Sequence, residues 1–311
     1  MPAARRRRPA AAALLLAGAG LIGSASLLLR PTRTSAMTAP LRRVLVTGGS
    51  KGIGRALCKQ LCRDHDFYVL LGSRDAGRGE EAVEAILKES PKCEGRIEML
   101  PLDVSEDASV ASAAESVAAK FGSEPAPLYG VVNNAGLGFG RSMADTLAVN
   151  AYGPKRVCEA FMPLLCQSEG RIANTASASG PMYVAGRPAE EQKIFANPAV
   201  TWEEIEALIS RALSSPGGEA YGFSKACLNA YTVLLAREHP NLRINSFTPG
   251  FILTDITRGM GATKSPDEGT KAAIHCLTAD LRENGWYYGS DAVRSPLDRY
   301  RGPGDPPYEG P

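Results

Sequence analysis

The sequence has few residues of the kinds that bind metals or form disulfide frameworks. It contains three histidines, His65, His239 and His275, which stand far apart and suggest no function. The seven cysteines are scattered, and no Cys-x-x-Cys pair occurs. Cys58 and Cys62 share a helix face, but no histidine or second cysteine pair accompanies them. We therefore expect no metal site, and we interpret the cysteines as buried free thiols in a reducing compartment.

Acidic residues are absent before Asp64, and this absence locates the basic excess of the chain. The whole chain carries a net charge of +2, whereas residues 1–40 contain six arginines and no acid, so the remainder carries −4. A body with that charge has no electrostatic reason to bind nucleic acid non-specifically. Nucleic acid is therefore not an expected partner.

Residues 1–40 have the composition of a targeting or anchoring leader. Arg5–Arg8 precede the apolar or small residues of Ala10–Leu29, a stretch about long enough to span a bilayer. An arginine-bearing, acid-free segment also suits import into a plastid or mitochondrion. Met37 offers an alternative start that would leave the protein cytoplasmic. The destination stays open, as does an extension without function, and membrane contact is expected only through this leader.

From residue 42 onward, short apolar runs alternate with amphipathic ones. Strand character occurs at 44–46, 67–71, 97–102, 129–132, 171–175 and 242–247, and helical periodicity near 53–63, 76–89, 106–121, 142–167, 219–238 and 266–280. This alternation predicts an α/β fold, a Rossmann-type doubly wound parallel sheet with helices on both faces. We expect a single domain over 41–295 and a flexible tail over 296–311.

The segment 180–219 is longer than a connection between a strand and a helix requires. It has a helix signal of its own, with Thr201 as N-cap, Glu204 three residues later, and Ile205 and Leu208 on one face. Long ordered insertions are often functional. We expect a helical insertion here, with a surface excursion without function as the alternative.

Two motifs far apart in the sequence indicate a hydride-transfer enzyme. Thr47-Gly-Gly-Ser-Lys-Gly-Ile-Gly54 lies between an apolar strand and a helix, the usual way to hold a pyrophosphate on backbone N–H groups. Tyr221 and Lys225 lie four residues apart on a predicted helix and project from one face. A phenol has a pKa of about 10, and a nearby ammonium lowers that pKa toward working pH.

With these residues the chain resembles the short-chain dehydrogenase/reductase family, and within it the NADPH-dependent carbonyl reductases. The resemblance extends over about 42–290 and includes Asn133-Asn134-Ala135-Gly136 and Pro249-Gly250 with Thr254-Asp255. It implies the catalytic set Asn150, Ser177, Tyr221 and Lys225. In that set Tyr221 protonates the carbonyl oxygen, Lys225 lowers the Tyr221 pKa and binds the nicotinamide ribose, Ser177 orients the carbonyl, and Asn150 holds a water next to Lys225.

Positive charge at the adenosine end predicts NADPH rather than NADH. About 20 residues beyond the glycines, NAD-dependent members place an acid on the ribose 2′-hydroxyl. Here Ser73 replaces that acid and Arg74 follows it, while Lys51 and Arg78 add charge suited to a 2′-phosphate. Asp103 resembles the residue beside the adenine, with a strand-end cap as the alternative. The expected cofactor contacts are Gly48, Ser50, Lys51, Gly52, Ile53, Gly54, Arg74, Arg78, Asp103, Val104, Asn134, Ala135, Gly136, Tyr221, Lys225, Pro249, Gly250 and Thr254.

The insertion and the segment 262–269 strengthen the resemblance to the carbonyl reductases, in which such an insertion covers the helix that other members use to dimerise. The resemblance therefore implies a monomer. It also implies a substrate wall of Phe251 with Met182 or Tyr183, suited to hydrophobic aldehydes, ketones and quinones. Phe251 has core packing as its alternative.

The chain departs from the family between Gly136 and Asn150, where 13 residues stand in place of a longer segment. The departure concerns the shape of the pocket and the placement of Asn150. Thr175-Ala176-Ser177 also replaces a more usual pair of serines. Two alternatives to a carbonyl reductase follow: an inactive NADP(H)-binding module, or a membrane-associated enzyme acting on a steroid- or retinoid-like alcohol.

Overall fold

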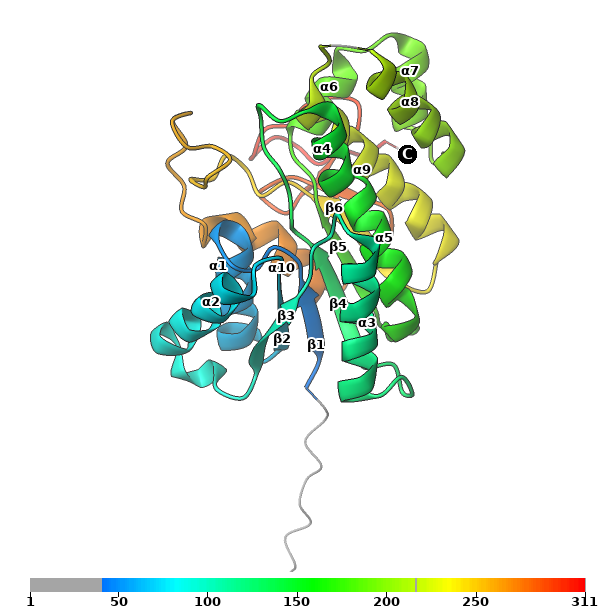
Figure 1. The fold of residues 1–311 in the computed structure, drawn as a ribbon. Helices are drawn as coiled ribbons and strands as arrows, with labels where there is room; N and C mark the ends of the chain where they lie inside the picture. The colour runs from blue at the N-terminus through cyan, green and yellow to red at the C-terminus, as the bar shows by residue number, and fades with distance from the viewer. Residues whose placement is uncertain (1–40, 216, 311) are drawn as a thin grey trace, which may run out of the picture. The chain divides into compact units, whose positions relative to one another are not determined.

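A central strand, β1 (Arg43–Val46), organises the sheet in a computed structural model that describes residues 41–215 and 217–310. The sheet has the order β3-β2-β1-β4-β5-β6-β7-β8, and every neighbouring pair is parallel except β7 with β8 (Figure 1). The remaining strands are β2 (Tyr68–Ser73), β3 (Ile97–Pro101), β4 (Leu128–Asn133), β5 (Arg171–Thr175), β6 (Arg243–Phe247), β7 (Tyr287–Tyr288) and β8 (Arg294–Ser295). The expectations for the leader concern residues outside the described ranges.

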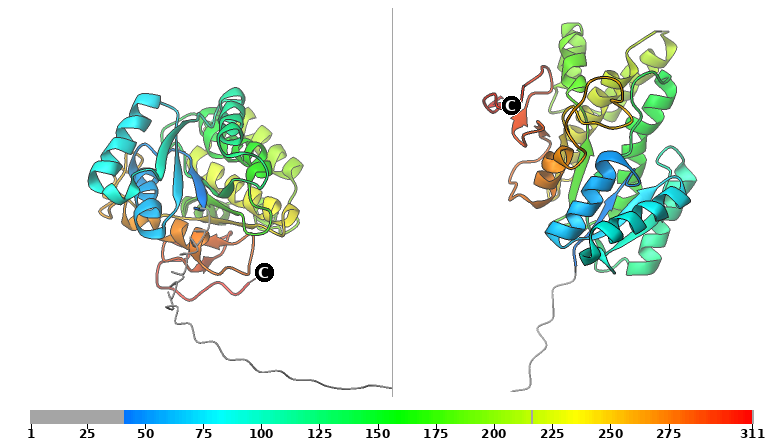
Figure 2. Two further views of the ribbon diagram at one scale, coloured as in Figure 1. Left: turned by 90° about the horizontal axis from the view of Figure 1, so that it is seen from below. Right: turned by 90° about the vertical axis from the view of Figure 1, so that its left-hand side faces the viewer.

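Helices cover both faces of the sheet, as Figure 2 shows. Side chains of β1 alternate between two apolar clusters: Leu45 faces one, while Val44 and Val46 face the other. The Val44 face is covered by α1 (Gly52–His65), α2 (Ala76–Glu89) and α10 (Lys271–Thr278). The Leu45 face is covered by α3 (Asp107–Phe121), α5 (Tyr152–Phe161) and α9 (Ala220–Glu238). Because both faces are buried, the strands read as continuous apolar runs, and the predicted doubly wound α/β fold is confirmed.

The predicted helix over 142–167 is divided in the structure. It forms α4 (Met143–Asn150), α5 and a 3-10 turn at Met162–Leu164, with Ala151 between the two helices. The physical reason is Pro154, which has no N–H to donate to the carbonyl of Asn150 four residues earlier. The other 3-10 turns are Pro91–Cys93 and Glu268–Thr270.

The insertion before α9 contains three helices, α6 (Ser179–Ala185), α7 (Ala189–Phe195) and α8 (Trp202–Ser214). The capping box expected at α8 is present: Thr201 Oγ1 accepts from the N–H of Glu204, and Glu204 Oε2 accepts from the N–H of Thr201. The ring of Trp202 packs edge-on against Tyr231 of α9, with 5.8 Å between centroids. The insertion therefore lies on α9, while the expected monomer stays a prediction.

All seven cysteines are free thiols, and six of them are buried. Among the described residues, no group of three or more histidines, cysteines and acids lies where it could hold a metal ion. Within residues 41–215 and 217–310, no helix has the length and apolar character needed to cross a membrane.

Residues 296–310, which we expected to form a flexible tail, are bonded to the body through Arg301. Its guanidinium bonds both carboxylate oxygens of Asp291, at 3.0 and 2.8 Å, and also the carbonyls of Asp305 and Pro306. The N–H of Gly304 donates to Asp291 Oδ2 at 3.0 Å. The two side chains of this ion pair are only 5% and 17% exposed. The Gly- and Pro-rich composition did not reveal these contacts of Arg301, and the flexibility of the tail stays a prediction.

We predict that Arg301→Ala destabilises the protein in a pH-dependent way. Partial burial acts to raise the Asp291 pKa, but hydrogen bonds from Arg301 and Gly304 outweigh it and lower the pKa from 3.8 to about 2. That difference corresponds to about 2 kcal/mol of stability, present above the ordinary aspartate pKa and lost as the pH falls through the folded value. Denaturant unfolding should show the loss at neutral pH and a smaller difference from wild type near pH 3.

Arg211→Ala is the matched control, because Arg211 forms an exposed pair with Glu191 on the insertion. Exposed pairs contribute about 0–1 kcal/mol. Equal losses in the two variants, or a loss in Arg301→Ala that does not depend on pH, would contradict the structural role of Arg301.

Candidate active site

The glycine-rich turn between β1 and α1 requires glycine at the positions that the sequence motif contains. Gly48 and Gly52 have φ values of +65° and +54°, a region that residues with a Cβ rarely adopt. A Cβ on Gly54 would lie 2.3 Å from the carbonyl oxygen of Gly48. No side chain caps α1, so the first N–H groups of this helix face the turn without a side-chain acceptor. This arrangement suits an anionic ligand at the helix N-terminus.

The end of β4 is hydrogen-bonded directly to this turn. Thr47 Oγ1 accepts from the N–H groups of Asn134 and Ala135, each at 3.0 Å. Asn134 Nδ2 donates to the carbonyls of Thr47, at 2.9 Å, and Gly48, at 3.2 Å. These bonds connect β1 and β4 at their carboxyl ends, where the strand order changes direction and doubly wound folds bind ligands.

The candidate reaction centre lies at the same edge of the sheet, between α9 and the end of β5. Lys225 is only 4% exposed, and its Nζ donates to the carbonyl of Thr175 at 2.7 Å. The Nζ lies 5.8 Å from the centroid of the Tyr221 ring. Ser177 lies just beyond β5, where its Oγ accepts from the N–H of Ser179 at 3.1 Å and lowers the pKa of the Tyr221 phenol. The fold therefore brings Ser177, Tyr221 and Lys225 together, as the sequence predicted.

The protonation of this centre differs from the sequence expectation. Tyr221 keeps part of its surface exposed, yet burial of its phenol raises its pKa, and the Glu219 carboxylate adds to that rise. The hydrogen bond from Ser177 acts in the opposite direction. Burial lowers the Lys225 pKa to about 8. The Lys225 ammonium is directed to the Thr175 carbonyl.

Asn150 is fully buried beside Lys225, and its side-chain amide is used within the protein. Its Oδ1 accepts from the N–H of Leu137 at 2.8 Å, while its Nδ2 donates to the Leu137 carbonyl at 2.9 Å and to Ser224 Oγ at 3.1 Å. The Asn150 carbonyl lacks the helical donor that Pro154 cannot supply. The water that the resemblance implies at Asn150 stays a prediction.

Glu219 is a site residue that the sequence analysis missed. It caps α9, and both of its carboxylate oxygens accept from the N–H of Gly222 at 2.9 Å. A Cβ on Gly222 would lie 2.8 Å from the carbonyl of Ser179, so α6 packs closely on this end of α9. The available signal was an acid at the first residue of the predicted helix 219–238, three residues ahead of a glycine.

Lys51 and Arg78, two of the three expected phosphate-binding cations, are held by neighbouring acids. Lys51 Nζ lies 2.6 Å from Asp255 Oδ2. Arg78 bonds Asp75 Oδ2 through both Nε, at 3.0 Å, and a terminal nitrogen, at 2.9 Å. Asp75 is also the N-cap of α2, which fixes this pair further. A bound phosphate would compete with these two carboxylates.

Arg74 is the cation of the three with the loosest pairing. Its Nε lies 3.9 Å from Asp103 Oδ2, and its side chain is 67% exposed. The other oxygen of Asp103 accepts from the N–H and hydroxyl of Ser105, at 3.0 and 2.6 Å. Asp103 therefore caps the end of β3, which was the alternative interpretation of this residue, and one oxygen remains beside Arg74.

The comparisons with known proteins agree with this geometry. The family model described as short chain dehydrogenase matches residues 42–189. (+)-Neomenthol dehydrogenase of Arabidopsis thaliana is 34% identical over 272 residues, which cover 75% of this chain and 90% of the relative. Carbonyl reductase (NADPH) 1 of Homo sapiens is 28% identical, with 77% and 91% covered. The structure of salutaridine reductase from Papaver somniferum matches with a TM-score of 0.70 at 28% identity, covering 79% of this chain and 99% of that one.

The chain belongs to the short-chain dehydrogenase/reductase family. It is therefore an NAD(P)-dependent oxidoreductase that acts on carbonyl or alcohol groups. The resemblance inferred from the sequence is confirmed at this level.

The residues of this dehydrogenase/reductase fit a dinucleotide along the carboxyl edge of the sheet. A Cβ on Gly52 would lie 3.5 Å from the methyl group of Thr254, so the segment after β6 lies against the glycine turn. Gly250 has a φ of +91°, which the turn after Pro249 requires. The other expected contacts in this region are placed less directly: Ser50 is half-exposed in the turn, Val104 is buried in the core, and Ile53 and Gly136 are partly exposed.

Exposed apolar side chains lie on segments that follow β4, β5 and β6 in this dehydrogenase/reductase, and one of them, Phe139, contacts Tyr221. Phe139, Met182 and Phe251 are all largely exposed and come from three segments that follow β4, β5 and β6. Tyr183 instead packs on Phe223 with 5.5 Å between ring centroids, inside the insertion. Of the two wall residues expected from the insertion, Met182 is thus the one open to a substrate, and Phe251 is not core.

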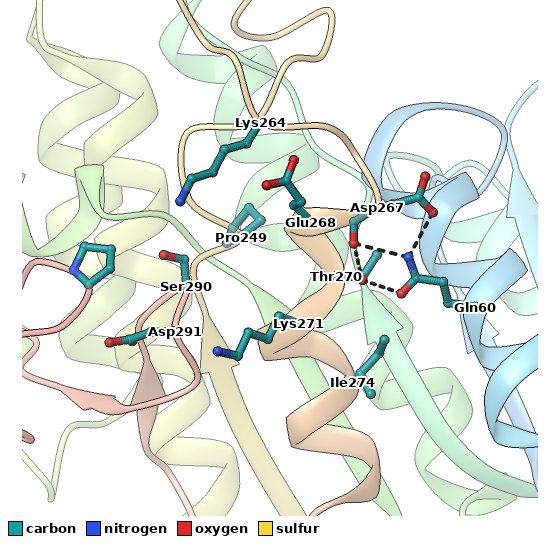
Figure 3. Close-up of a pocket in the computed structure, with 11 residues that line it drawn as sticks. Gln60, Pro249, Lys264, Asp267, Glu268, Thr270, Lys271, Ile274, Ser290 and Asp291 are labelled. Atoms are coloured by element: carbon teal, nitrogen blue, oxygen red, sulfur yellow. Dashed lines mark hydrogen bonds between the residues drawn. The ribbon is translucent and has the colours of Figure 1, made fainter.

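A pocket that Pro249 lines on one side contains none of the candidate catalytic residues (Figure 3). Gln60 and Asp267 meet at one side of it, with Nε2 of the glutamine 2.9 Å from a carboxylate oxygen, while Lys264 and Lys271 extend into it. Its charged residues are mostly paired or exposed, so we assign it no function.

We predict that Gly54→Ala abolishes dinucleotide binding, whereas Gly77→Ala does not. The new Cβ at 54 would lie 2.3 Å from the Gly48 carbonyl and 2.4 Å from Asn134 Nδ2, so the turn must distort. At Gly77, also in the first turn of a helix, the nearest atom would lie 3.6 Å away, and alanine should stabilise by about 0.5–1 kcal/mol. NADPH fluorescence titration and thermal unfolding would measure both effects. Wild-type affinity in Gly54→Ala would show that the turn does not hold the cofactor.

Proposed function

We propose that this protein is an NADPH-dependent carbonyl reductase that converts hydrophobic aldehydes, ketones and quinones to alcohols. The observation that carries the proposal is the placement of Tyr221 and the buried Lys225 at the end of β5, with the lysine Nζ 5.8 Å from the centroid of the Tyr221 ring and 2.7 Å from the carbonyl oxygen of Thr175. Burial raises the Tyr221 pKa, so the phenol retains the proton that a reduction needs at neutral pH. Oxidation of an alcohol would need the phenolate as base, a form that the raised pKa makes scarce at neutral pH.

The side chains at this site divide the work of reduction. A bound nicotinamide cofactor supplies the hydride that the carbonyl carbon accepts. Ser177 donates a hydrogen bond to the carbonyl oxygen, and Tyr221 transfers its proton to that oxygen as negative charge develops there. Lys225 has a pKa of about 8, so it carries a proton at neutral pH one helical turn from Tyr221. It is the adjacent group from which the phenol regains its proton.

The exposed apolar side chains support a hydrophobic substrate. Exposed apolar patches next to a few convergent polar groups are typical of ligand sites. Here Phe139 lies against the Tyr221 ring, and Met182 and Phe251 are largely exposed on the segments that follow β5 and β6. The names of relatives, among them a neomenthol dehydrogenase, a salutaridine reductase and carbonyl reductase (NADPH) 1, agree with small organic alcohols and carbonyl compounds as substrates.

The first test is loss of NADPH absorbance with the purified protein and benzaldehyde or a quinone. We expect turnover by the wild type. In Tyr221→Phe, kcat should fall by about 100-fold or more, because the substitution removes the hydroxyl that donates the proton and keeps the aromatic ring of residue 221. NADPH affinity should be nearly unchanged. Tight NADPH binding without turnover of any carbonyl would instead support an inactive NADP(H)-binding module.

A second prediction concerns the choice of cofactor. Arg74 is the least engaged of the three cations, so Arg74→Ala should weaken NADPH binding about tenfold, the loss of one charge-assisted hydrogen bond, and leave NADH binding unchanged. Arg78→Ala is the matched control and should have a smaller effect, because Arg78 is held by Asp75. Titration of both cofactors against both variants measures this. Equal losses for NADPH and NADH would show that Arg74 does not contact the 2′-phosphate.

A further inference from the structure

The shortened segment after β4 passes directly over the candidate active site. Two hydrogen bonds to Asn150, of 2.8 and 2.9 Å, hold its first residue, Leu137. Its other end is held at Ser142, whose hydroxyl accepts from the N–H of Asp145 and caps α4. Only residues 138–141 lie between these two anchors, so the segment has little freedom to move away from the site.

The aromatic ring of Phe139 lies on the ring of Tyr221. The two centroids are 4.4 Å apart and the ring planes are inclined at 50°. This distance is at the short end of the range for aromatic pairs in contact. Phe139 nevertheless remains 47% exposed, so its ring lies at the mouth of the site rather than in the core.

Gly138, the residue before Phe139, packs against another loop and leaves no opening between the segment and that loop. A Cβ on Gly138 would lie 2.7 Å from a methyl group of Ile256, so the backbone at 138 packs against the loop 251–264. That contact leaves no space for a side chain between the two segments. A substrate must therefore approach Tyr221 beside the Phe139 ring, and not between residue 138 and this loop.

We propose that Phe139 is a specificity residue, a fixed aromatic wall that admits flat carbonyl compounds and excludes those with bulk on both sides of the carbonyl. The inference rests on the proposed function. A carbonyl oxygen has to come within about 2.6–3.2 Å of the Tyr221 hydroxyl to receive its proton. Phe139 covers one face of that phenol. A planar aldehyde or quinone can lie along the Phe139 ring, whereas a branched ketone would collide with this ring.

The test compares the full-length wild type with Phe139→Ala, using benzaldehyde as the flat substrate and pivalophenone as the branched one. We expect the ratio of kcat/KM for pivalophenone to that for benzaldehyde to rise about tenfold or more in Phe139→Ala, since pockets discriminate bulk by such factors. The gain should come through a lower KM for pivalophenone. NADPH affinity, measured by fluorescence, should not change.

Three further variants complete the test. Phe139→Tyr keeps the aromatic ring and should keep the wild-type ratio of kcat/KM values. Phe139→Leu replaces the ring by a smaller side chain and should shift the ratio in the same direction as Phe139→Ala. It serves as the test if the alanine variant folds poorly. Leu213→Ala removes an equally exposed apolar side chain on α8 and should leave the ratio unchanged. An unchanged ratio in folded, NADPH-binding Phe139 variants would overturn the role of Phe139 alone. Absence of turnover by the wild type would overturn the proposed function and this inference with it.

Discussion

The hydrogen bond from the buried Lys225 ammonium to the Thr175 carbonyl constrains the rest of the site. Burial of an ammonium is costly unless an acceptor compensates it, and here the acceptor lies at the last residue of β5. This hydrogen bond therefore fixes the position of α9 along the strands of the sheet. In that position Tyr221 lies beside Ser177, which follows β5. A Cβ on Gly180 would lie 3.1 Å from the backbone of Lys225, so the chain after Ser177 also depends on this close approach.

Buried amides extend this constraint through the sheet. Asn133 Nδ2 donates to Asn174 Oδ1 at 2.8 Å, and Asn174 Nδ2 donates to Thr232 Oγ1 at 2.9 Å, which joins β4, β5 and α9 beneath the reaction centre. At the same end of β4, the next residue, Asn134, is bonded to the glycine turn. The side of the fold that holds the cofactor and the side that carries Tyr221 are thus connected by two consecutive asparagines at the carboxyl end of one strand. Buried polar networks of this kind restrict the arrangement of the core, although Asn133 Oδ1 has no hydrogen-bond partner among the described residues.

Sequence periodicity was sufficient for the parts of the fold that local pattern determines. The bounds of β5 and α2 match the predicted ones, and the capping box of α8 is where Thr201 and Glu204 placed it. β7 and β8, with two residues each, are too short to show an alternating pattern. The contact between the tilted rings of Phe139 and Tyr221 and the acids that hold Lys51 and Arg78 were not predictable from local pattern either. These features are contacts between side chains whose relative positions only the folded chain defines.

The pH dependence of carbonyl reduction tests the central claim most directly. If Tyr221 donates its proton and Lys225 returns one, kcat should be constant through neutral pH. It should then fall as the pH rises through about 8, where the buried lysine loses its charge, although Tyr221 itself still holds its proton. A reduction rate that instead increases with pH through that range would mean that the reaction needs a deprotonated group. That result would contradict the assignment of Tyr221 as the proton donor and of Lys225 as the group that reprotonates Tyr221.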